Sequence, residues 1–171
     1  MTTIQNTRTW QVRPISADAL AELRTADDAG NPPRLVTDSG GGSPLRCCLS
    51  SSAPGEQIAL VSYAPLRRWT AETGADPGPY DELGPVFIHP RDCGGPAVCG
   101  FPVAYLGSCR MFRAYSADGS ILGGRLTEAG ELGSIEDAGR VLDEVFTDPR
   151  VAVVHARAVE FGCFTFEVRR S

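Results

Sequence analysis

The sequence contains no lysine, and all 16 of its basic residues are arginine. Without a lysine amine the chain cannot form a Schiff base, attach pyridoxal phosphate, carry biotin or lipoate, or use the phosphate-binding lysine of a P-loop. A codon bias of a high-GC genome is the simplest explanation. The exclusion of these chemistries holds whatever the cause.

The chain also lacks any run that approaches the roughly 18 to 20 apolar residues of a membrane-spanning helix. Its polar N-terminal segment has no hydrophobic signal region. We therefore expect a cytoplasmic protein without a membrane partner, in which the six cysteines are reduced thiols. The net charge of −5 argues against nucleic acid as a partner. The sequence does not determine the oligomeric state.

The length of 171 residues and a hydrophobic content of 42% are typical of one domain, residues 1–171, with one core. Periodicity predicts strands within 7–15, 45–66, 85–89, 110–128, 150–159 and 162–170. It predicts helices over 16–26 and 134–148. Turn residues predict loops over 27–44, 67–84 and 90–109. Ser16 and Ser134 are the expected N-caps of the helices, and Asp118-Gly119 is the expected hairpin turn. This non-alternating order predicts an α+β fold with a mostly antiparallel, curled or barrel-like sheet of about seven or eight strands and two helices packed on one side.

The two histidines follow a similar pattern, because each closes an apolar run and precedes a cysteine. His89 ends "GPVFIH" and is followed by Cys93, whereas His155 lies in "VAVVHAR" and is followed by Cys163. Strand parity places both histidines at the ends of buried strands, where a fold often holds polar groups at a pocket mouth. We therefore expect a small-molecule site around His89, Cys93, His155 and Arg157.

This pattern is compatible with catalysis, with metal binding, with anion binding, or with a purely structural role. In a catalytic site, Cys93 or Cys163 would be the nucleophile, His89 or His155 the acid or base, and Arg157 the anchor of a substrate carboxylate. Alternatively, structural zinc could bind to a set that lies within 21 residues of sequence: His89, Cys93, Cys99 and Cys109. These spacings match no familiar zinc motif, so we assign no metal ligands and no cofactor.

A polar or anionic ligand could instead bind to arginines near the strand ends without any reaction. The arginines in suitable positions are Arg46, Arg110, Arg113 and Arg157. Glu82, in the segment "YDEL", could act as a base near His89 or contact the ligand. Cys47 and Cys48 are adjacent, so on a strand their side chains would point to opposite faces and could not bind one metal ion. The structural alternative is that the histidines and thiols simply belong to the core.

Several of these segments together resemble an uncharacterised bacterial family, DUF1203, catalogued as a domain of unknown function. The resemblance extends over about residues 30–170 and rests mainly on the run ending in His89, on Cys93, and on "HAR" and "GCF" in the C-terminal part. It implies a single cytoplasmic bacterial domain. It implies no activity, cofactor or substrate.

Overall fold

The structure is a computed structural model that describes residues 8–171. Its strands are β1 Trp10–Arg13, β2 Arg34–Asp38, β3 Pro44–Leu45, β4 Ser50–Ser51, β5 Glu56–Tyr63, β6 Gly84–Ile88, β7 Arg110–Ser116, β8 Ile121–Leu126, β9 Val151–Ala158 and β10 Phe164–Arg170. The α-helices are α1 Ala17–Leu23, α2 Pro65–Thr73 and α3 Ile135–Val145, and two short 3-10 helices span Gly78–Tyr80 and Val103–Tyr105. None of the helices in this described part is both long and apolar enough to cross a membrane.

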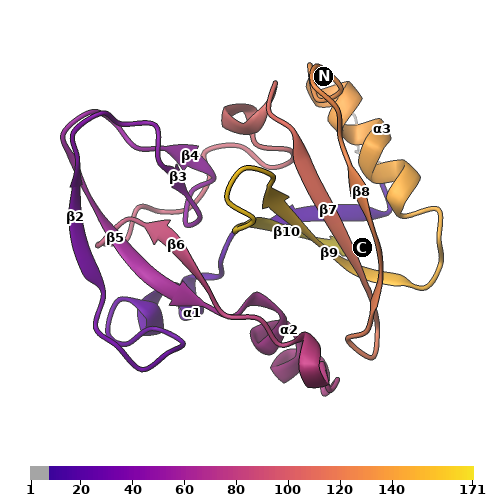
Figure 1. Ribbon diagram of the computed structural model, residues 1–171, viewed down its shortest axis with the longest axis horizontal. Helices are drawn as coiled ribbons and strands as arrows, with labels where there is room; N and C mark the ends of the chain where they lie inside the picture. The colour runs from indigo at the N-terminus through magenta and orange to yellow at the C-terminus, as the bar shows by residue number, and fades with distance from the viewer. Residues whose placement is uncertain (1–7) are drawn as a thin grey trace, which may run out of the picture.

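The strands form two open sheets of five strands each (Figure 1). The β9 sheet has the order β1-β10-β9-β7-β8, and the β5 sheet has the order β2-β5-β6-β3-β4. Neighbouring strands are antiparallel except β3 and β6, which are parallel. The predicted α+β class and mostly antiparallel pairing are confirmed, but the single curled or barrel-like sheet is wrong. The Gly- and Pro-rich loop after β6 carries the chain into the other sheet, where β7 pairs with β9 instead of closing a barrel.

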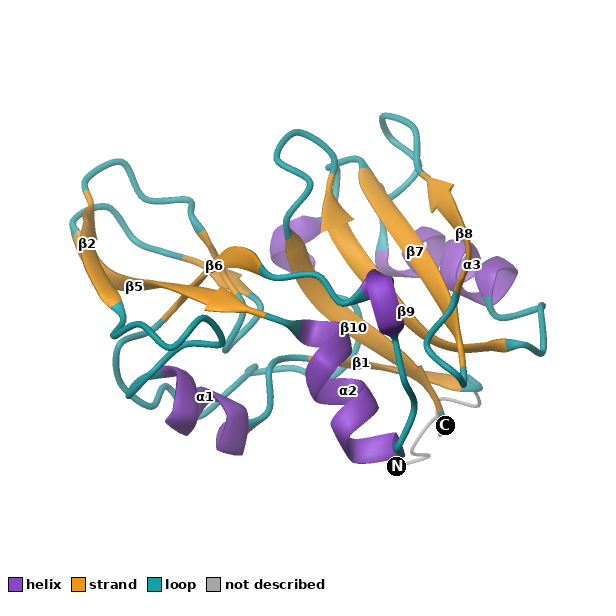
Figure 2. Cartoon of the chain, turned by 60° about the horizontal axis from the view of Figure 1, so that its bottom comes forward, coloured by secondary structure: helices purple, strands orange, loops and turns teal. Residues whose placement is uncertain are grey.

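The helices pack on different surfaces, so the prediction of two helices on one side is also wrong. Val141 and Leu142 of α3 belong to the core on one face of the β9 sheet. Leu66 and Trp69 of α2 pack against Tyr115 and Val153 on its opposite face. The helix α1 packs against the β5 sheet instead. Figure 2 shows α1 and α2 below the two sheets, with α3 behind β7 and β8.

Most predicted elements are present, but two of the predicted loops contain a strand or most of an α-helix. The N-caps Ser16 and Ser134 and the β7–β8 hairpin through Asp118-Gly119 are confirmed. Inside the predicted loop 27–44, β2 pairs with β5. The predicted loop 67–84 overlaps α2, which has a proline in its first turn and ends at Gly74 with φ +77°. Proline at the start and a left-handed glycine at the end are favourable helix boundaries.

Candidate metal centre

The adjacent cysteines lie in a tight turn between β3 and β4, not on a strand. Residues 46–49 form this turn, in which the Leu49 N–H donates to the Leu45 carbonyl at 2.9 Å. Consecutive side chains do not alternate in such a turn, so both thiols reach the same imidazole. The Sγ atoms of Cys47 and Cys48 lie 3.2 and 3.7 Å from His89 Nδ1. The expectation that these two cysteines point to opposite faces is therefore wrong.

His89 follows the last residue of β6, and the parallel pairing of β3 with β6 places it beside the turn. The His89 backbone N–H donates to Cys47 Sγ at 3.1 Å. On the other side of the ring, His89 Nε2 lies 2.9 Å from Glu56 Oε1. A carboxylate bound to one ring nitrogen fixes the orientation of the imidazole and leaves the other nitrogen free to coordinate a metal ion. Glu56 therefore holds Nδ1 towards the thiols.

Cys93 completes the group from the loop after β6. The ligand atoms of Cys47, Cys48, His89 and Cys93 all lie within 4.8 Å of one another. Arg24 stabilises the chain leading to Cys93, because it donates to the carbonyls of His89 at 3.1 Å and Arg91 at 2.9 Å. Cys47 is buried, Cys48 and His89 are half-buried and Cys93 is exposed. The cluster therefore has one side open to solvent.

The two adjacent thiols share one proton unequally. The hydrogen bond from Cys47, with a further one from Ser50, lowers the pKa of Cys48 to about 5 despite partial burial. The same hydrogen bond, together with burial, raises the pKa of Cys47 well above its ordinary value. The thiolate form is therefore favoured at Cys48 and the proton at Cys47, and a bound metal ion would displace that proton.

Three sulfur donors and one imidazole nitrogen are ligands typical of zinc in a four-coordinate site. In a tetrahedral site with bonds of about 2.3 Å the ligand atoms are roughly 3.8 Å apart. The separations within the cluster, all under 4.8 Å, need only small adjustments to reach this geometry. The group includes no oxygen donor, which disfavours magnesium and calcium.

The cluster contains two of the four residues considered as zinc ligands in the sequence. His89 and Cys93 belong to the cluster, whereas Cys99 and Cys109 lie outside it and Cys47 and Cys48 take their places. Cys99 is instead close to β1, where it borders a cavity with Trp10. Cys47 and Cys48 are not recognised as ligands from the sequence when they are placed on a strand. The proline before them and the serine run after them were the available signals of a turn.

The structure does not bring His155 into this cluster. His155 lies in β9 with no exposed surface, and its Nε2 is 3.1 Å from Glu167 Oε2. The rings of Tyr115 and Phe164 pack against the imidazole, with centroids 4.9 and 5.3 Å away. His155 therefore belongs to the core of the protein, and the two histidines have separate sets of contacts.

The remaining residues predicted for the site lie either around Glu82 or around Cys163. Arg113 and Arg157 both form ion pairs with Glu82, at 2.8 and 2.9 Å. Arg46 is buried beside Cys163, which is half-buried. Glu82 therefore neutralises two of the arginines that the sequence suggested for anion binding, and it does not contact His89.

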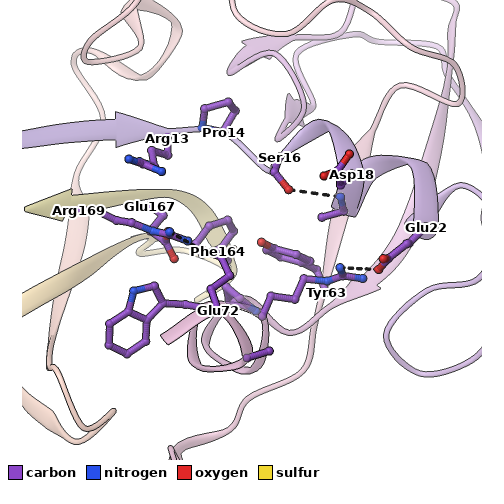
Figure 3. A pocket seen from close by; sticks show the side chains of 15 residues that line it. Arg13, Pro14, Ser16, Asp18, Glu22, Tyr63, Glu72, Phe164, Glu167 and Arg169 are labelled. Atoms are coloured by element: carbon purple, nitrogen blue, oxygen red, sulfur yellow. Dashed lines mark hydrogen bonds and ion pairs between the residues drawn. The ribbon is translucent and has the colours of Figure 1, made fainter. Parts of the chain in front are cut away.

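A cavity of about 650 Å³ lies between α1, α2 and the adjoining ends of β1 and β10 (Figure 3). Tyr63, Trp69 and Phe164 form the aromatic part of its wall. The charged groups on the wall include the ion pairs Arg68–Glu22 and Arg169–Glu72. None of the predicted catalytic residues lines this cavity. The predicted small-molecule site and the cavity therefore do not coincide.

The fold and the site define a class: an α+β protein with a thiol and imidazole cluster that could bind a metal ion. The chain belongs to the DUF1203 family, described as proteins of unknown function, whose model matches residues 42–170. All four residues of the cluster lie within this range. No curated protein and no solved structure matches the chain.

Proposed function

We propose that this protein binds one zinc ion through Cys47, Cys48, His89 and Cys93, and that the ion has a structural role. The observation that supports the proposal best is the convergence of these four side chains within 4.8 Å from three separate segments of the chain. Four protein ligands leave no open position for substrate, which is typical of structural rather than catalytic zinc. The bound ion would hold the β3–β4 turn, the end of β6 and the following loop together.

The metal content of the purified protein tests this proposal directly. Protein prepared in reductant without chelator is expected to contain about one zinc ion per chain by elemental analysis and native mass spectrometry. The Cys48→Ser and Cys93→Ser variants are expected to lose the ion. Cys99→Ser is the matched control for Cys93→Ser, because both thiols are exposed and only Cys93 belongs to the cluster. Wild-type protein that stays metal-free after incubation with zinc would contradict the proposal.

Cobalt substitution provides a second test that does not depend on how the protein was purified. Cobalt(II) bound by three thiolates and an imidazole in a tetrahedral site is expected to give intense visible absorption bands. The Glu56→Gln variant keeps the four ligands but weakens the contact that orients His89. We therefore expect this variant to bind the metal at least about tenfold more weakly than wild type, with the same spectrum. An unchanged affinity would show that Glu56 does not support the site.

The same residues also form an arrangement compatible with thiol catalysis, which is the second candidate function. The Cys48 sulfur lies 3.7 Å from His89 Nδ1, and Glu56 lies 2.9 Å from His89 Nε2, as in a nucleophile, base and orienting carboxylate. His89 Nδ1 cannot bind a metal ion and accept a thiol proton at once. Iodoacetamide labelling therefore separates the functions: rapid labelling of Cys48 in metal-free native protein, unaffected by added zinc, would favour catalysis.

A further inference from the structure

The four arginines that the sequence suggested for anion binding differ in how their charge is balanced. Arg113 and Arg157 share the carboxylate of Glu82. Arg46 and Arg110 are more deeply buried, with 2% and 7% of their surface exposed. Within residues 8–171, neither has a carboxylate oxygen within 4 Å. A buried charge without a counter-charge is unfavourable, so this second pair requires an explanation.

The hydrogen bonds of Arg46 and Arg110 satisfy only part of their donors. Arg46 donates from Nε to the Phe164 carbonyl at 2.8 Å and from Nη1 to the Pro44 carbonyl. Arg110 donates from Nη1 to the Cys109 carbonyl at 3.2 Å, while its buried Nε has no partner. Carbonyl groups are neutral, so these bonds orient the guanidinium groups without balancing their charge.

Tyr105 provides a third donor beside these arginines. Its side chain is 2% exposed, and its buried hydroxyl has no hydrogen-bond partner. The Arg110 Cζ atom lies 5.1 Å from the centroid of the Tyr105 ring. Burial raises the pKa of Tyr105 to about 12, and the nearby charges of Arg46 and Arg110 oppose this shift. The three side chains therefore form one group.

The acidic groups close enough to act on Arg46, Arg110 or Tyr105 include Glu160 and the thiols of Cys48 and Cys163. No carboxylate among residues 8–171 forms an ion pair with either arginine. Burial lowers the pKa of Arg110, and Glu160 is close enough to oppose this shift without forming an ion pair. Arg46 is likewise buried, and Tyr105 and the Cys163 thiol lie near it. The unused Arg110 Nε is a donor, and the Tyr105 hydroxyl can donate as well as accept. A negatively charged acceptor would satisfy both groups and balance the charge of the arginines.

We propose that Arg46, Arg110 and Tyr105 form a binding site for a small oxyanion, either a phosphate or a carboxylate group. The guanidinium groups would supply the charge and paired donors that such groups need, and the tyrosine hydroxyl would donate one more hydrogen bond. Arg110 is the most exposed of the three residues, at 7%, and the nearby Cys163 is half-buried, so an anion would enter from this side. The proposal does not depend on zinc, because none of these three residues is a ligand of the metal cluster.

Calorimetric titration with inorganic phosphate and, separately, with acetate tests the proposal on the full-length protein. We expect saturable binding of at least one of the two anions with one site per chain. Arg110→Gln is expected to weaken that binding about tenfold or more, because a charged donor to the anion is lost. Arg34→Gln, which removes an exposed arginine of β2, is the matched control and is expected to leave affinity unchanged. Absence of saturable binding of both anions, or equal affinity in the two variants, would overturn the proposal.

The Tyr105→Phe variant removes only one hydroxyl and preserves the packing of the ring, so it remains informative if Arg110→Gln fails to fold. If the hydroxyl binds the anion, Tyr105→Phe will bind the anion several-fold more weakly than wild type. If the hydroxyl is merely buried, Tyr105→Phe will be more stable than wild type and its anion affinity will be unchanged. This second result would overturn the site as proposed.

Discussion

At the scale of single residues, the buried contact between His155 and Glu167 is important for stability. His155 has no exposed surface, and 9% of the Glu167 side chain is exposed. Arg169 also contacts this carboxylate at the surface side. Removing one member of a buried ionisable pair leaves the other without a partner in a place that water reaches poorly.

We therefore expect His155→Ala to lower the free energy of unfolding by about 3 kcal/mol, from the cavity and from the loss of the buried partner of Glu167 together. Urea denaturation followed by fluorescence measures this change. Arg34→Ala, on the exposed side of β2, is expected to change stability by less than about 0.5 kcal/mol. A loss below about 1 kcal/mol in His155→Ala would indicate that the imidazole is not a core hydrogen-bonding group.

The same contact predicts how stability depends on pH. Burial alone would raise the pKa of Glu167, but the hydrogen bond and charge of His155, with the charge of Arg169, lower it below 4.5. The ionised carboxylate therefore favours the folded state. This contribution is fully present above the unfolded pKa of about 4.5 and is lost as the pH falls through the lower folded value.

Glu167→Gln should consequently show a flatter decline of stability below about pH 4.5 than wild type. Urea denaturation at a series of acidic pH values measures the slopes. Glu72→Gln, which removes the more exposed carboxylate partner of Arg169, should keep the wild-type slope. Parallel profiles for wild type and Glu167→Gln would contradict a lowered pKa of Glu167.

At the scale of elements, α3 depends on its N-terminal cap. The Ser134 hydroxyl accepts the Asp137 N–H at 3.1 Å and donates to the Asp137 carboxylate at 2.7 Å. Ser134→Ala is therefore expected to lower the free energy of unfolding by about 1 kcal/mol in chemical denaturation. Ser39→Ala, at an exposed position without such a cap, is the control and should behave like wild type. Equal stability of the two variants would show that the cap does not contribute.

Elements with a local signal could be predicted from the sequence, whereas their assembly could not. The caps of α1 and α3 and the Asp118-Gly119 turn depend on residues within a few positions of one another. The division into two sheets depends on which distant strands pair, and no local pattern encodes that choice. The helix α2 was missed because its first residues, Pro65 and Leu66, were assigned to the end of a strand.

The candidate site follows the same distinction. His89 and Cys93 lie four positions apart, and the sequence placed them together correctly. Cys47 and Cys48 join them because a strand pairing and a turn bring residue 47 next to residue 89. His155 has a local pattern similar to that of His89, but the pairing of β9 with β10 buries it beside Glu167. Tertiary pairing therefore decides which histidine is available to a ligand.

At the scale of the whole molecule, the metal cluster lies where the chain leaves the β5 sheet for the β9 sheet. Cys93 is near the start of the connection between β6 and β7, while its three partner ligands belong to the turn and strand end beside it. A bound ion would therefore anchor the first part of this connection. Without the ion, Arg24 remains as a hydrogen-bonding anchor through the carbonyls of His89 and Arg91.

Removal of the metal should therefore loosen the chain around Arg91 while leaving α3 intact. We expect trypsin to cleave after the exposed Arg91 about tenfold faster in chelator-treated protein, because local opening of the loop no longer requires loss of a metal ligand. Mass spectrometry of the fragments measures this rate, and cleavage after Arg140 in α3 provides an internal reference. In Cys93→Ser the chelator should make no difference, because this variant has already lost the anchoring thiol. Equal cleavage after Arg91 with and without metal would show that the ion does not hold this connection, even if the cluster binds it.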